Sequence, residues 1–168
     1  YERWWTGEKF DRILIDAPCS ASGVIRRHPD IKTLRRETDV QALVELQAEI
    51  LDAAWQMLAV GGELLYVTCS IFKDENEAQM KRFLSGHKNA KALEITDEMV
   101  GINWGRSCDP GRQLFPGQHA ADGFYFCRLK NWPELMDCAG FLVSANHNWY
   151  VKMMILSVNF TASQTHHP

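Results

Sequence analysis

The sequence predicts an α/β protein built on a parallel sheet. Two short aliphatic runs, within RILIDA and GELLYVT, are separated by a long segment whose apolar residues follow helical spacing. A second helical pattern follows the second run, which gives the order strand, helix, strand, helix. A helical crossover between two strands makes them parallel parts of one sheet. In such sheets, ligands bind beyond the carboxyl ends of the strands.

The first strand and the first helix have clear signals. Residues 13–15 are three consecutive branched aliphatics, typical of a strand buried on both faces, and this strand is expected to end near Asp16. The helix is expected to begin at Thr38, with Gln41 completing a capping box. We predict that it runs for about 20 residues and stops at the glycine pair 61–62.

The later elements are expected to repeat this order. A second strand over residues 64–67 leads to Cys69, and a second helix follows, with Asp74 and Glu77 as its cap pair. A weak third strand is predicted in KALEIT and a stronger fourth strand in DGFYFCRL. The residues between them, 101–121, are rich in Gly and Pro and are predicted to form a long loop.

One domain is expected over residues 1–130, and residues 131–168 are predicted to lie outside its fold. A chain of 168 residues that is 46% hydrophobic suffices for one core and is too short for two. From Cys138 onward the only Lys, Arg, Asp or Glu is Lys152. This composition fits either the end of a frameshifted or truncated gene or an authentic extension. Because the chain starts at Tyr1 without a targeting peptide, we interpret it as a fragment.

Composition excludes several classes of protein. A formal charge of -3 and a pI near 6.1 exclude a uniformly basic nucleic-acid binder, but they leave room for a local basic patch. The five cysteines form no CxxC pair and have no metal-ligand spacing, which favours reduced thiols. No apolar run reaches the roughly 18 residues of a membrane span. We therefore expect a cytoplasmic monomer with no membrane segment and no metal.

Two cysteines follow the ends of predicted parallel strands. Cys19 lies three residues after Asp16, and Cys69 follows the second strand. Because adjacent strands are about 4.8 Å apart, both thiols and the Asp16 carboxyl are expected in one crevice. A disulfide is conceivable at this distance, although a reducing compartment and the nearby acid argue against it. The remaining cysteines are expected to be small buried apolar residues: Cys108, Cys127 and Cys138.

A thiol pair beside a carboxyl suits methylation of cytosine at carbon 5. Carbon 5 is a poor nucleophile, so a thiolate first adds to carbon 6 and forms an enamine that accepts a methyl group from a sulfonium donor. A carboxyl group can stabilise the charge that develops on the base. A general base must then remove the proton from carbon 5 so that the thiol can leave. Two thiols and an acid thus have separate tasks.

The motifs DAPCSASGVIRRHPDIK, GGELLYVTCSIFKDENE and LFPGQHAADGFYFCRLK resemble the C-terminal catalytic part of bacterial 16S ribosomal RNA cytosine-5 methyltransferases of the Sun (Fmu) family. The resemblance implies a class I, Rossmann-like methyltransferase sheet that is incomplete here, with S-adenosylmethionine as cofactor and ribosomal RNA as partner. It also implies that Cys69 is the nucleophile and that Cys19 assists breakdown of the adduct. Asp16 would contact the target base and border the cofactor.

Three points qualify the resemblance. Spacing does not distinguish Cys19 from Cys69, and cytosine-5 DNA methyltransferases attack with a Pro-Cys cysteine, so the swapped assignment stays open. The glycine-rich donor loop of the family is expected before Tyr1, so the fragment alone is expected to be inactive. Finally, Thr33 stands where the family usually has tryptophan after the lysine of DIK.

A basic loop follows Cys19. Residues 26–37 contain five Lys or Arg and two acids, and neutralisation of phosphates dominates nucleic-acid affinity. Gly23 and Pro29 suit a turned loop that approaches a flipped-out base. The predicted RNA-binding residues are Arg26, Arg27, His28 and Lys32. Two other interpretations stay open: a noncatalytic RNA-binding remnant and a thiol redox protein.

Overall fold

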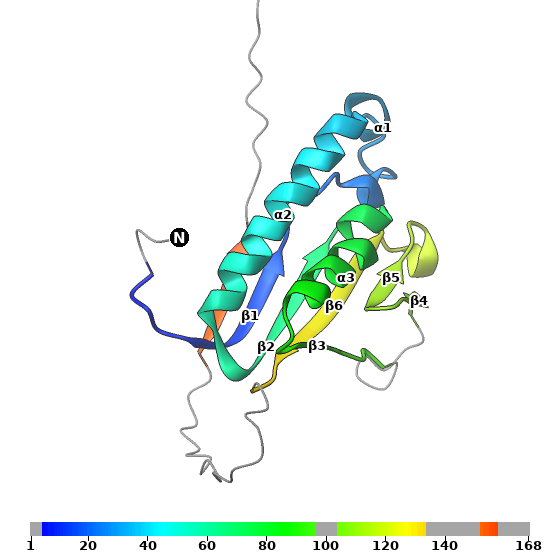
Figure 1. Ribbon diagram of the computed structural model, residues 1–168. Coiled ribbons are helices and arrows are strands. Elements are labelled where there is room, and N and C mark those ends of the chain that lie inside the picture. Colours follow the sequence, from blue (N-terminus) through cyan, green and yellow to red (C-terminus); the bar gives the residue numbers. More distant parts are fainter. Residues whose placement is uncertain (1–4, 97–103, 134–151, 158–168) are drawn as a thin grey trace, which may run out of the picture.

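A computed structural model describes residues 5–96, 104–133 and 152–157 (Figure 1). Its centre is a seven-stranded sheet in the order β4-β5-β6-β2-β1-β7, with β3 also paired to β6. The strands are β1 (Phe10–Asp16), β2 (Leu58–Thr68), β3 (Ala90–Leu93), β4 (Arg106–Ser107), β5 (Arg112–Leu114), β6 (Phe124–Asn131) and β7 (Met153–Ser157). The helices are α1 (Ile31–Leu34), α2 (Glu37–Met57) and α3 (Glu77–Gly86), and there are three short 3-10 turns, η1 (Ser22–Val24), η2 (Lys73–Glu75) and η3 (Gln118–Ala120).

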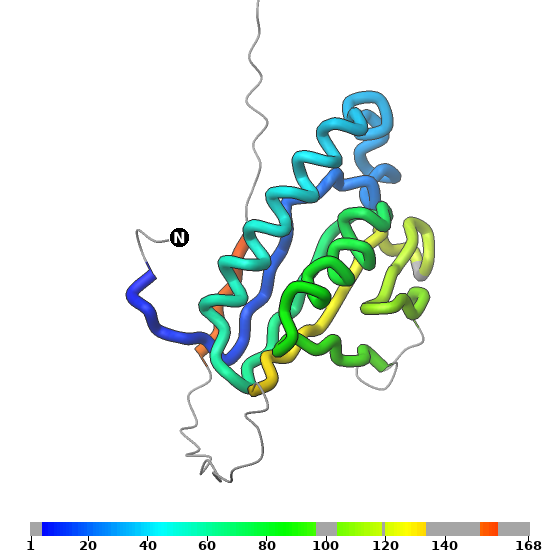
Figure 2. Tube along the Cα trace, viewed as in Figure 1, coloured from blue at the N-terminus to red at the C-terminus, as the bar shows by residue number. Residues whose placement is uncertain are grey.

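The predicted α/β class is confirmed. β1 and β2 are parallel, with Ile13 opposite Leu64 and Asp16 opposite Val67, and α2 is the crossover between them. β6 joins β2 in the antiparallel sense. Because β1 and β2 are parallel, their carboxyl ends lie at the same edge of the sheet. Figure 2 shows the turns that follow these two strands next to each other.

The core lies between the sheet and the two long helices, which cover the same face (Figure 1). Leu51, Ala54 and Met57 of α2 are almost fully buried because they share the face of the helix that meets β1 and β2. Met80 and Phe83 of α3 extend this core. On the opposite face, a cavity of about 300 Å³ is lined by the following residues: Arg12, Ile13, Leu14, Glu63, Leu64, Leu65, Arg128 and Met153.

The predicted helix boundaries need correction. α2 ends at Met57 because Leu58 already has extended backbone angles and begins β2. The glycine pair 61–62 lies inside β2, where the pairing with β1 is irregular, so these glycines serve a bulge instead of a helix stop. Neither predicted cap pair stands at its helix start, since α2 is preceded by Arg36 and α3 by Asn76.

Two other expectations change in part. The third strand, β3, starts one residue before KALEIT and stops at Leu93. The predicted loop over residues 101–121 contains β4, β5 and η3, because its short segments pair with each other and with β6.

A strand is also present in the segment that was expected to lie outside the fold. β7 pairs in parallel with β1, from Arg12 opposite Met153 to Asp16 opposite Ser157. The backbone of β7 pairs with N–H and C=O groups of β1 that would stay unpaired if β1 were an edge strand. These five residues belong to the sheet, although residues 131–168 were expected to lie outside the fold. Residues 134–151 and 158–168 lie outside the described residues.

Candidate active site at the carboxyl ends of β1 and β2

The two strand-end cysteines meet. Asp16 is the last residue of β1, and Cys69 directly follows β2. The Sγ atoms of Cys19 and Cys69 are 3.4 Å apart, and both side chains are half-buried free thiols. This distance confirms the expectation that the parallel strand ends bring the two thiols close together.

Two loops carry these thiols, which we call the Cys19 loop (residues 17–24) and the Cys69 loop (residues 69–76). The Gly23 N–H donates to the Cys69 carbonyl over 2.8 Å, and the Gly123 N–H donates to the Gly23 carbonyl over 2.8 Å. A Cβ atom on Gly23 would lie 2.1 Å from the Gly123 oxygen and 2.7 Å from the Cys69 oxygen. The backbones approach so closely that only glycine fits.

The electrostatic surroundings of the two thiols differ. The hydrogen bond between the two thiols raises the pKa of the Cys19 thiol, and burial raises it further. The same hydrogen bond lowers the pKa of the Cys69 thiol, although burial and the Asp16 charge oppose this effect. The thiolate is the reactive form of cysteine, so a lowered pKa favours the reactive form at Cys69.

Asp16 presents an exposed carboxylate at the end of β1. The Ser157 hydroxyl of β7 donates a hydrogen bond to its Oδ2 over 3.2 Å. An exposed carboxylate can accept hydrogen bonds from hydroxyl and amino groups. Asp16 therefore offers a hydrogen-bond acceptor to a hydroxyl or amino group of a ligand at this edge of the sheet.

A buried polar cluster behind the thiols was missed from the sequence. Glu75 of η2 is fully buried and accepts hydrogen bonds from Ser20, Ser70 and Gln47. Gln47 of α2 also donates to the Pro18 carbonyl over 2.8 Å. The signal that points to this cluster is the repeated dipeptide Cys-Ser, which occurs at residues 19–20 and again at 69–70.

The basic loop lies between η1 and α2, on the surface. Arg26, Arg27, His28 and Lys32 are all exposed. Arg27 forms an ion pair of 2.5 Å with Asp122, and Arg26 donates to the Ala120 carbonyl over 2.9 Å. The structure thus anchors two of the four predicted RNA-binding side chains on the loop before β6 and leaves much of both guanidinium groups exposed.

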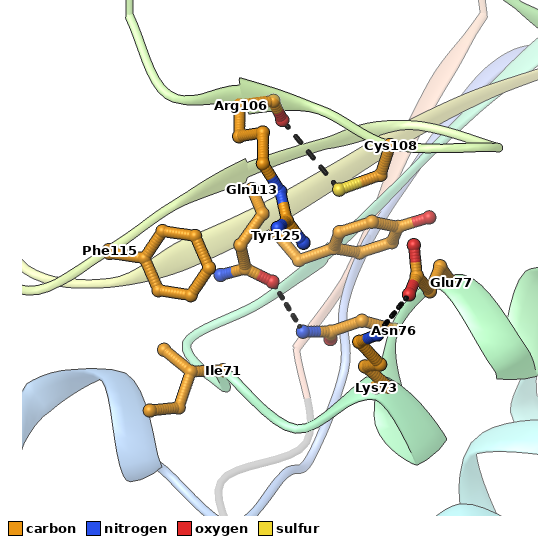
Figure 3. A pocket seen from close by; sticks show the side chains of 9 residues that line it. All are labelled: Ile71, Lys73, Asn76, Glu77, Arg106, Cys108, Gln113, Phe115 and Tyr125. Carbon is orange, nitrogen blue, oxygen red and sulfur yellow. Dashed lines mark hydrogen bonds and ion pairs between the residues drawn. The ribbon is translucent and has the colours of Figure 1, made fainter.

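A second cavity, of about 220 Å³, adjoins the Cys69 loop (Figure 3). Its lining consists of Ile71, Lys73, Asn76, Glu77, Arg106, Cys108, Gln113, Phe115 and Tyr125. The Gln113 amide accepts from Asn76 over 2.8 Å and donates to the Ser70 carbonyl over 3.2 Å. The cavity wall therefore supports the turn that holds Cys69.

The other cysteines behave differently from one another. Cys127 is fully buried in the core, as expected, and burial raises its thiol pKa to about 12. Cys108 is only half-buried, contrary to the expectation, because it lies in the short hairpin that lines the second cavity. Cys138 lies outside the described residues.

The described parts of the chain hold neither a helix suited to span a membrane nor a cluster suited to bind a metal ion. None of the helices found there combines the length and apolar character needed to cross a membrane. The same residues contain no cluster of three or more His, Cys, Asp or Glu side chains placed to hold a metal ion.

Comparison with known proteins gives consistent matches. The family described as 16S rRNA methyltransferase RsmB/F matches residues 1–130. Ribosomal RNA small subunit methyltransferase B of Vibrio cholerae is 56% identical over 128 residues, which are 76% of this chain and 27% of that protein. The protein of the same name from Escherichia coli strain K12 is 49% identical over 130 residues, 77% of this chain and 28% of that protein. The chain thus spans little more than a quarter of these relatives.

Solved structures resemble the same part of the chain. The crystal structure of PH0851 superimposes with a TM-score of 0.65 at 33% identity, covering 71% of this chain and 26% of that one. The crystal structure of NSun6 from Pyrococcus horikoshii with SFG gives a TM-score of 0.64 at 30% identity, covering 76% and 32%.

Proposed function

Because the chain belongs to the 16S rRNA methyltransferase RsmB/F family, we propose that the whole protein containing it methylates carbon 5 of a cytosine in 16S ribosomal RNA. The reaction would use S-adenosylmethionine and a covalent adduct with Cys69. The observation that carries this proposal is the thiol pair, with Sγ atoms 3.4 Å apart and thiol pKa values shifted in opposite directions. The SFG ligand of the NSun6 relative is an analogue of the proposed cofactor.

The thiols divide the covalent steps between them. The Cys69 thiolate adds to carbon 6 of the cytosine, and the electron pair moves to carbon 5. S-adenosylmethionine, when bound, would supply the electrophilic methyl group for carbon 5 and leave as S-adenosylhomocysteine. Cys19, whose Sγ is 3.4 Å from that of Cys69, would then assist breakdown of the adduct. In this step a general base accepts the carbon 5 proton, the Cys69 thiolate leaves with the electron pair of the carbon–sulfur bond, and the aromatic ring is restored.

Asp16 and the basic loop would hold the substrate. The exposed Asp16 carboxylate suits the exocyclic amine of the flipped cytosine, and it also borders the cofactor. The four exposed side chains Arg26, Arg27, His28 and Lys32 would face the phosphates on either side of that base. We expect methyl transfer to need the rest of the protein, since this chain spans little more than a quarter of the relatives that it matches.

A trapping experiment tests the covalent mechanism. Residues 1–130 replace the matching region of the Vibrio cholerae relative, and the chimera is incubated with S-adenosylmethionine and 16S RNA containing 5-fluorocytosine. Fluorine blocks the final elimination, so we expect a denaturation-resistant protein–RNA adduct. Cys69→Ala should abolish the adduct and Cys19→Ala should retain it, whereas an adduct in the Cys69→Ala chimera would show that the nucleophile is assigned wrongly.

The sulfur–sulfur distance also favours a second candidate function, thiol redox chemistry. Two thiols 3.4 Å apart need little movement to form a disulfide. A titration of this chain in glutathione buffers distinguishes the two. A Cys19–Cys69 disulfide that is stable at cytosolic potential would favour the redox function, and reduced thiols under these conditions would favour methyl transfer.

A further inference from the structure

Each of the two cysteines is followed by a serine, and both serines bind the same carboxylate. The backbone N–H of Ser20 donates to Oε1 of Glu75 over 2.7 Å, and the Ser20 hydroxyl donates to Oε2 over 2.6 Å. The Ser70 hydroxyl donates to the same Oε2 over 2.5 Å. Glu75 therefore holds the residue after each thiol. It lies 55 residues from Ser20 and 5 residues from Ser70 in the sequence.

Glu75 is an unusual group to find at this position. Its side chain is fully buried, and no ion pair among the described residues includes it. A buried carboxylate without a cation is unfavourable by several kcal/mol unless hydrogen bonds compensate. Here four donors compensate, the fourth being the Gln47 amide at 3.2 Å. Charge-assisted hydrogen bonds of this kind are short and geometrically strict.

The contacts of Glu75 join three elements around the thiols. Ser20 belongs to the Cys19 loop, Ser70 to the Cys69 loop, and Gln47 to α2, from which it also reaches the Pro18 carbonyl. Among the described residues, no hydrogen bond joins the carboxylate to either sulfur atom. Its effect on geometry must therefore pass through the two serines.

We propose that Glu75 is a positioning residue that fixes the separation of the Cys19 and Cys69 thiols by holding the serine after each of them. This inference rests on the proposed function and deepens it, because Cys19 can act on the adduct of Cys69 only while the two sulfur atoms stay in contact. The negative charge of Glu75 also raises the pKa of both thiols. Glu75 thus acts on the spacing of the pair and on its ionisation.

The spacing can be measured on this chain with phenylarsine oxide. Arsenic(III) forms one bond to each of two thiols, and its oxygen leaves as water with the two thiol protons, so no electrons are transferred. The affinity depends on the effective concentration of one thiol at the other. Mass spectrometry identifies the bridged peptides, and competition with a small dithiol gives the relative affinity.

Four variants separate positioning from general loss of structure. Glu75→Ala and the double variant Ser20→Ala/Ser70→Ala should lower the affinity for the arsenical about tenfold or more, as expected for the loss of buried charged hydrogen bonds. Glu75→Gln, which keeps the shape and one acceptor, should restore most of the affinity. Glu49→Gln removes an exposed carboxylate from α2 and should match the unchanged chain.

A folded Glu75→Ala chain with an affinity within about twofold of the unchanged chain would overturn the proposal. If circular dichroism shows that Glu75→Ala does not fold, the double serine variant decides by the same criterion. Glu75→Gln supplies a second readout. Because the Glu75 charge raises the pKa of Cys69, its loss should lower the pH midpoint of Cys69 alkylation. An unchanged midpoint would also count against the assignment of Glu75. None of these measurements needs RNA or cofactor, so a failed 5-fluorocytosine trap would reject the proposed function without affecting this result.

Discussion

The Cys19 loop and the Cys69 loop begin at equivalent points of the fold but give their thiols different properties. Both follow the carboxyl end of a parallel strand, and the two sulfur atoms touch. Nevertheless the pKa of Cys19 is raised and that of Cys69 is lowered, because one thiol donates the hydrogen bond that the other accepts. Position at a strand end brings a residue to the site, and its neighbours decide what that residue can do.

The loops also differ in how their backbones are supported. Both β1 and β2 have paired strands on both sides, but the Cys69 loop turns directly into η2 and α3. The Cys19 loop leads to exposed basic residues, and it is held against the Cys69 loop at Gly23. We therefore expect the largest effects from substitutions at this contact between the two loops.

The largest effect is expected for Gly23→Ala. Its Cβ would meet two backbone oxygens that cannot move independently, and overpacking of this kind lowers the free energy of unfolding by about 1–3 kcal/mol. Urea denaturation of this chain measures the change. The matched control is Gly86→Ala at the end of α3, where a Cβ meets nothing within 4 Å and stability should stay equal or increase. Equal stability of the two variants would show that the loops are not tightly apposed.

A smaller effect is expected when the thiol hydrogen bond is removed. Cys19→Ala eliminates the largest cause that lowers the Cys69 pKa, so the pH midpoint of Cys69 alkylation should rise. Each unit of rise lowers the thiolate fraction near pH 7 about tenfold. Iodoacetamide rates between pH 6 and pH 10, read by peptide mass spectrometry, test this sign.

Cys108→Ala is the control for that measurement, because Cys108 lies on the second cavity and is not among the main causes of the Cys69 pKa shift. A midpoint that falls in Cys19→Ala would mean that the hydrogen bond runs in the opposite direction. The difference between the two loops would then be reversed, and Cys19 would be the more reactive thiol.

The smallest effect is expected for Asp16→Asn. The Asp16 charge raises the pKa of Cys69, but its effect on that pKa is smaller than the effects of the hydrogen bond and of burial. Its removal should therefore lower the midpoint of Cys69 alkylation by less than Cys19→Ala raises it. Glu49→Gln on α2 removes an equal charge from an exposed position and should leave the midpoint unchanged. A rise in Asp16→Asn would contradict the assigned electrostatic role.

A second contrast is between the residues that match the family and β7. The family match ends at residue 130, yet β7 pairs with β1 along five residues and reaches Asp16 through Ser157. Composition did not reveal this strand, because periodicity alone does not distinguish a short apolar run in a buried strand from one in a buried helix segment. Only the edge of β1 gives that run a partner.

The sequence by itself determined the parts of this protein that depend on local pattern. Aliphatic runs specified β1 and β2, helical spacing specified α2, and the order of these elements made the strands parallel and brought Cys19 and Cys69 together. The tertiary structure decided the end of α2, the bulge at the glycine pair 61–62 and the burial of Glu75. Each of these depends on groups far apart in the chain, whose hydrogen bonds and close contacts exist only in the folded protein.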